Sequence, residues 1–138
     1  MVIGKHNILG HFFEYNNEYF DGILPIPNIE LMESFHTFGF FECEFDEDDS
    51  IVNPTIKIST NYDYSESQLR DILVHEMIHY YLAYVGKDVM VHHGKEFKKM
   101  AKDFNLNYGM NISTTIDETE YAVREGKSTF WHKLSTWF

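Results

Sequence analysis

Apolar residues recur at helical spacing in three parts of the chain. The first part extends from Ile8 to Phe20, where apolar side chains three or four positions apart would form one face of a helix. Asp21-Gly22 and the prolines that follow it end this pattern. The second part extends from about Glu66 to Val85, and the third begins after Gly94. The sequence therefore predicts three helices.

The second predicted helix has clear start and stop signals. Ser65-x-x-Gln68 has the form of a capping box, in which the hydroxyl and the amide each bind a free backbone N–H at a helix start. Gly86 would close the helix, because glycine readily adopts the left-handed conformation that often follows a last turn. Both signals favour a long, well-defined helix between these positions.

The third predicted helix is amphipathic. Its apolar face comprises Phe97, Met100, Ala101 and Phe104, and a second face, here called the lysine row, comprises Lys95, Lys98, Lys99 and Lys102. A row of this kind could hold a nucleic-acid backbone, whereas many such rows are solvated helix faces. The sequence alone leaves both interpretations open.

Between the first two helices the pattern changes to that of short strands. Ile29 to Phe35 and Phe38 to Phe45 are extended segments separated by the short turn region His36-Thr37, which predicts an antiparallel pair. The acidic run Asp46 to Ser50 is expected to be a solvated connection. Thr55 to Ser59 then alternates as a half-buried strand does. We expect an α+β domain with about three strands.

Composition and charge restrict size, partners and location. A chain of 138 residues with 43% hydrophobic residues can form one compact core. The net charge of -11 argues against an obvious nucleic-acid binder, although six acids gathered between Glu42 and Asp49 contribute much of it. Cys43 is the only cysteine, which excludes an internal disulfide and a cysteine zinc ribbon. With neither a signal-peptide pattern nor an apolar run of about 18 residues, we expect a soluble cytoplasmic protein without a membrane partner.

The second predicted helix also carries His75-Glu76-x-x-His79. Residues four apart lie one turn above each other, so two imidazoles could bind the same ion, with Glu76 beside them. A catalytic zinc uses three protein ligands and leaves its fourth position to a water, whose proton a nearby carboxylate accepts. The pentapeptide therefore predicts two ligands and a general base.

A third ligand must come from further along the chain. The metzincin pattern needs glycine and histidine three and six residues after the second histidine, but Leu82 and Val85 occupy those positions. Glu96 could be the third ligand, as a glutamate is in other zincins. Its distance from His79 in the sequence is, however, short for those families. His92 and His93 remain as candidates just before the third helix.

The motifs together resemble a known family. The run His75-Glu76-Met77-Ile78-His79-Tyr80-Tyr81, followed after a gap by His93-Gly94-Lys95-Glu96-Phe97, resembles the SprT-like family, the metalloprotease domain of Spartan-type DNA–protein crosslink proteases. That family combines HExxH with a third histidine in an H-G-x-x-F segment. Phe13-x-x-Asn16-x-x-Tyr19-Phe20-Asp21-Gly22-x-Leu24-Pro25 resembles its first helix and exit, and Asn107 to Ser113 resembles its segment after the third helix. The similarity covers residues 8 to 113.

The resemblance implies a fold, an activity and a ligand set. The fold is a single zincin-like α+β domain over residues 1–113, followed by a C-terminal tail, 114–138. The activity is that of a zinc-dependent endopeptidase acting on protein or peptide substrates, including DNA-associated proteins. His75, His79 and His93 would hold Zn²⁺, Glu76 would be the general base, and His92 is the rival third ligand. The alternative is a non-catalytic, zinc-containing module with a DNA-associated or regulatory binding role.

Two further sets of residues each have two interpretations. Asp71, one turn before His75, could orient that imidazole or simply place negative charge near the start of the helix. The phenols of Tyr80, Tyr81 and Tyr84 could stabilise an oxyanion or belong to the core and its rim.

Overall fold

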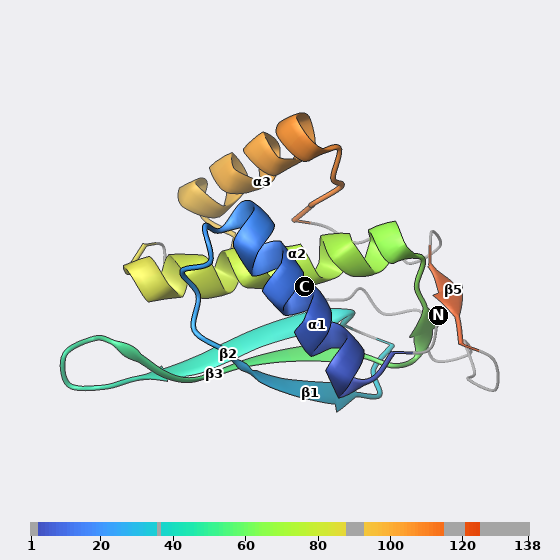
Figure 1. Cartoon of the computed structure of the whole chain (residues 1–138), viewed down its shortest axis with the longest axis horizontal. Helices are drawn as coiled ribbons and strands as arrows, with labels where there is room; N and C mark the ends of the chain where they lie inside the picture. Colours follow the sequence, from blue (N-terminus) through green and yellow to red (C-terminus); the bar gives the residue numbers. More distant parts are fainter. Residues whose placement is uncertain (1–2, 36, 88–92, 115–120, 125–138) are drawn as a thin grey trace.

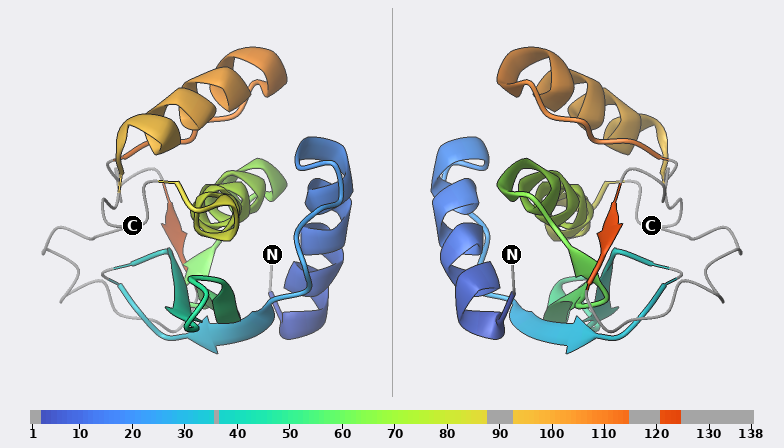
Figure 2. Two further views of the ribbon diagram at one scale, coloured as in Figure 1. Left: turned by 90° about the vertical axis from the view of Figure 1, so that its left-hand side faces the viewer. Right: turned by 90° about the vertical axis from the view of Figure 1, so that its right-hand side faces the viewer.

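A computed structural model of the chain describes residues 3–35, 37–87, 93–114 and 121–124 (Figure 1). Its helices are α1 (Lys5–Tyr19), α2 (Glu66–Val85) and α3 (Lys95–Tyr108), and its strands are β1 (Asn28–Met32), β2 (Gly39–Phe45), β3 (Ile51–Ser59), β4 (Tyr62–Asp63) and β5 (Ala122–Val123). Helix α2 lies between the three-stranded sheet and α3, with α1 beside it, as the end views of Figure 2 show. The predicted α+β class, with three helices and a sheet of three strands, is confirmed.

The three-stranded sheet has the order β1-β3-β2. The strand that comes last of these three in the sequence, β3, is therefore the central one. Strand β3 runs parallel to β1 and antiparallel to β2. The predicted antiparallel pairing of 29–35 with 38–45 is therefore wrong. The physical reason is burial: Ile56 and Ile58 on β3 are both 0% exposed, and a strand this deeply buried is best covered when it has a neighbour on each side.

The acidic connection is confirmed as an exposed turn, although β3 begins at Ile51, earlier than the predicted 55–59. Asp46 organises this turn. Its Oδ1 accepts hydrogen bonds from the backbone N–H groups of Asp48 (2.9 Å) and Ser50 (3.0 Å), and its own N–H donates to the Ser50 carbonyl (2.9 Å). The turn joins β2 and β3 as a hairpin, so much of the negative charge lies away from the helices (Figure 1).

The predicted capping box of α2 is confirmed. Ser65 Oγ accepts from the Gln68 N–H (3.1 Å), and the Ser65 N–H donates to Gln68 Oε1 (3.0 Å). Gly86 closes the helix with a φ of 74°, and the next N–H, of Lys87, donates to the Leu82 carbonyl (2.8 Å). Fixed at both ends, α2 is a rigid element on which a site can be held in place.

Hydrogen bonds join the segment between α1 and β1 to two helices, α1 and α2. The buried Asn16 amide donates to the Leu24 carbonyl (2.9 Å) and accepts from the Leu24 N–H (3.2 Å). One residue later, the Pro25 carbonyl accepts a hydrogen bond from the Tyr80 hydroxyl (2.7 Å). These bonds connect α1, the segment and α2 into one unit.

The predicted tail, residues 114–138, lies mostly outside the described residues. Of this range the structure describes Thr114 and residues 121–124, where β5 pairs antiparallel with β4. In the described part of the chain, no helix combines the length and the apolar character needed to cross a membrane.

Candidate metal centre

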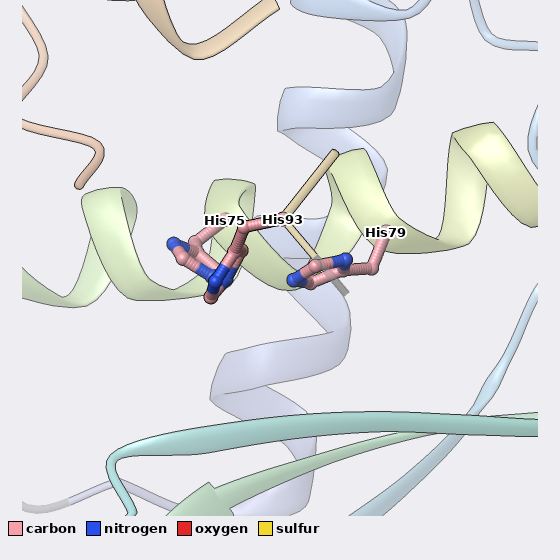
Figure 3. Close-up of side chains that lie close together, drawn as sticks. All are labelled: His75, His79 and His93. Atoms are coloured by element: carbon pink, nitrogen blue, oxygen red, sulfur yellow. The ribbon is translucent and has the colours of Figure 1, made fainter. Parts of the chain in front are cut away.

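His75, His79 and His93 lie together although the third is distant in the sequence (Figure 3). Their ring centroids are each 5.1 Å from the other two, so the rings form an equilateral triangle. Nε2 of His75 is 3.1 Å from Nε2 of His93, and one ligand nitrogen from each ring lies within 4.8 Å of the others. A group of this geometry and donor chemistry could hold a metal ion.

Two elements bring these rings together. His75 and His79 come from successive turns of α2, and His93 comes from the residue before Gly94, the N-cap of α3. His75 is fully buried, whereas His79 and His93 are half-buried, so the group lies at the edge of the core rather than in its centre. His92, the rival third ligand, lies outside the described residues.

Phe97 forms one wall of the group. This side chain is 0% exposed, and its ring centroid lies 4.7 Å from that of His75, 4.5 Å from that of His79 and 4.7 Å from that of His93. Its contact with His79 is a stacked one, with an interplanar angle of 22°. The ring therefore restricts all three imidazoles and excludes water from one side of them.

Glu76 is buried against the sheet. Only 1% of the residue is exposed, and within the described residues its Oε2 has no hydrogen-bond partner. Burial raises the pKa of the Glu76 carboxyl well above its usual range. A buried carboxyl oxygen without a partner is costly to maintain, and such groups are concentrated at sites that bind or transform a ligand.

Asp71 and Tyr80 have partners elsewhere. Asp71 Oδ1 binds the Arg70 guanidinium (3.0 and 3.1 Å), and its Oδ2 accepts from the Asn111 N–H (3.2 Å), so this carboxylate connects α2 to the segment after α3. The Tyr80 hydroxyl donates to Pro25. These contacts favour the structural interpretation of both residues over the chemical one.

The lysine row lies on the exposed face of α3, as its spacing predicts. Two of its members, Lys98 and Lys102, line a hollow of about 570 Å³ together with Ala101, Asn105, Leu106, Ile112, Ser113 and Thr114. The hollow is formed by the helix and the segment that follows it. The row therefore belongs to a different surface of α3 from the buried Phe97.

Two residues lie at the site although the sequence patterns did not place them there. The sequence predicts Phe97 as part of the apolar face of the third helix and includes Gly39 only in the extended segment Phe38 to Phe45. The H-G-x-x-F segment contains a signal for Phe97, because it places an aromatic ring one helical turn after the histidine-glycine pair. Gly39 lies on a distant strand, so only the folded chain brings it to Glu76.

Comparison with known families and proteins gives one positive result. The family model described as the SprT-like family matches residues 9–117, most of the chain and all three histidines. A comparison with curated proteins finds no significant match. The matched region contains most of α1 and all of the three-stranded sheet, α2 and α3, and so the elements that carry the candidate metal centre. The chain belongs to the SprT-like family.

Proposed function

We propose that this protein is a zinc-dependent endopeptidase of the SprT-like type. The observation that carries the proposal is the convergence of three imidazoles beside the buried carboxyl of Glu76, whose Oε2 has no hydrogen-bond partner among the described residues. Three neutral nitrogen donors suit zinc, although they accept other divalent ions. His75, His79 and His93 would hold the ion, and family membership supports this assignment.

A divalent ion bound there would act as a Lewis acid toward water and a peptide carbonyl. Glu76 would accept the proton of the attacking water and later pass a proton to the leaving amine. Phe97 would keep the imidazoles in place and limit the access of bulk water. The rigid, capped α2 supports this assignment, because it carries both the carboxyl and two of the histidines.

The outer edge of β2 is a candidate binding surface for the substrate. Among the described residues β2 pairs only with β3, and the Ser59 N–H donates to the Phe38 carbonyl (2.8 Å). This bond makes Gly39 and Ile58 a non-hydrogen-bonded pair, so the N–H and C=O of Gly39 point away from β3. An extended substrate could therefore pair with β2 as an added strand.

The test is cleavage of an unfolded protein by purified wild type and by Glu76→Gln, each loaded with zinc and analysed for bound metal. We expect Glu76→Gln to retain zinc and to lose about 10²- to 10⁴-fold in rate, the usual contribution of a general base. Glu47→Gln, the same change in the exposed turn, is the matched control and should remain fully active. Full activity of zinc-loaded Glu76→Gln would refute the proposed mechanism.

The lysine row supports a second candidate, a DNA-associated binding module without turnover. Its four exposed lysines could contact phosphates, in which case DNA affinity would fall steeply with salt and on neutralising Lys95, Lys98, Lys99 and Lys102. The two candidates are separated by an assay in which a DNA-binding protein is the substrate and its cleavage is measured in the presence and in the absence of DNA. Metal-dependent cleavage supports the endopeptidase, and salt-sensitive binding without any cleavage supports the module.

A further inference from the structure

Gly39, the first residue of β2, lies directly against the side chain of Glu76. A Cβ atom added to Gly39 would be 3.0 Å from Glu76 Oε2, 3.1 Å from Glu76 Cγ and 3.1 Å from Ile72 Cγ2. Each of these distances is shorter than ordinary van der Waals contact between such atoms. The strand therefore has no room for any side chain where it meets the candidate general base.

Space, and not backbone conformation, requires glycine at this position. Gly22, Gly86 and Gly109 have positive φ angles, which favour glycine whatever their surroundings, and Gly39 does not belong to this group. Gly10 offers the opposite comparison, because a Cβ there would meet no atom within 4 Å. Gly39 thus lacks a positive φ and is constrained instead by the face of α2 formed by Ile72 and Glu76.

The start of β2 cannot easily move away from α2. The Phe38 ring is 1% exposed and is packed between Tyr62 and Tyr121, with centroid distances of 4.5 and 4.2 Å. The Phe38 carbonyl is also bound by the Ser59 N–H. Because the strand is held and α2 is capped at both ends, the side chain of Glu76 is the part that would give way to a methyl group.

We propose that Gly39 is a positioning residue for Glu76: because Gly39 has no side chain, it leaves the space against β2 that the carboxyl occupies, and any side chain there would displace the carboxyl. The inference rests on the proposed function and extends it to a residue on the sheet. The backbone N–H and C=O of Gly39 point toward the outer edge of β2. The same residue therefore sets the separation between the carboxyl and a substrate strand paired with that edge. A general base must lie within hydrogen-bond reach of the proton it abstracts, and a displacement of about 1 Å can cost about 10²-fold in rate.

The first measurement is the kinetics of zinc-loaded Gly39→Ala. We expect kcat to fall by about 10²-fold, while KM and zinc affinity change by less than about threefold, a change too small to reflect a damaged ligand set. Gly10→Ala is the matched control, since the same methyl group enters open space and should leave kcat unchanged. Wild-type kcat in Gly39→Ala, or an equal loss of zinc affinity, would overturn the inference.

The second measurement does not depend on activity. Denaturant midpoints are compared for Gly39→Ala in the wild-type background and in Glu76→Ala, which removes two of the three close contacts. We expect the midpoint loss caused by Gly39→Ala to shrink by more than half in the Glu76→Ala background. If Gly39→Ala alone is insoluble, we expect the double variant with Glu76→Ala to be soluble and folded. That result would show the same energetic coupling between the two positions.

Equal midpoint losses in both backgrounds, or no recovery of an insoluble single variant, would overturn the inference whatever the activity. The proposed function fails in a different way. A wild-type protein that binds zinc but cleaves no unfolded protein would refute the endopeptidase, and the stability cycle would still report the contact between Gly39 and Glu76.

Discussion

Phe97→Ala removes the ring that contacts all three histidines. The side chain is 0% exposed, so its truncation should lower the free energy of unfolding by about 3–5 kcal/mol through lost burial and the remaining cavity. Its ring lies 4.5–4.7 Å from each imidazole centroid, so the three rings would also gain freedom. We expect zinc affinity to fall by about 10- to 100-fold, as it does when groups that orient metal ligands are lost.

Zinc affinity is best measured by competition with a coloured chelator, at a temperature at which each variant is folded. Under that condition a loss of stability alone does not change the intrinsic affinity of the folded state. Phe104→Ala is the matched control, because this ring lies on the same helix, is 9% exposed and contacts Tyr19, Phe20 and Tyr108. The control should lose stability and keep its zinc affinity. Equal zinc affinities in both variants would refute the reasoning about Phe97.

Two further predictions concern the segment between α1 and β1. Asn16→Ala should lower the free energy of unfolding by about 2–4 kcal/mol, because it leaves the buried N–H and C=O of Leu24 without partners; urea midpoints would show this, and a loss no larger than that of the exposed Asn17→Ala would contradict it. Burial raises the pKa of Tyr80 from 10.0 to about 12, so the stability this phenol contributes is present below pH 10 and is lost as the pH rises through about 12. Urea midpoints of the wild type should therefore fall more steeply over that range than those of Tyr80→Phe, and identical slopes would count against the assignment.

The local features of this protein could be predicted from its sequence because they depend on neighbours in the chain. The capping box of Ser65 and Gln68, the end of α2 at Gly86 and the two faces of α3 all depend on spacings of a few residues. The pairing of His75 with His79 across one helical turn belongs to the same class. For His93 the spacing left alternatives, and the family resemblance selected it. The fold then brought its ring to the other two.

Only the tertiary structure decided which strands are neighbours and what surrounds the candidate site. The turn region after β1 predicted a hairpin with β2, but the burial of β3 placed that strand between them, because the free energy of burying Ile56 and Ile58 depends on the whole core. The contact of Gly39 with Glu76 joins residues 37 positions apart, and the packing of Phe97 against α2 joins two helices. The sequence thus determined the donor groups and the helix that carries His75, Glu76 and His79. Long-range packing determined that Phe97 and the start of β2 surround these groups, because such contacts join distant parts of the chain.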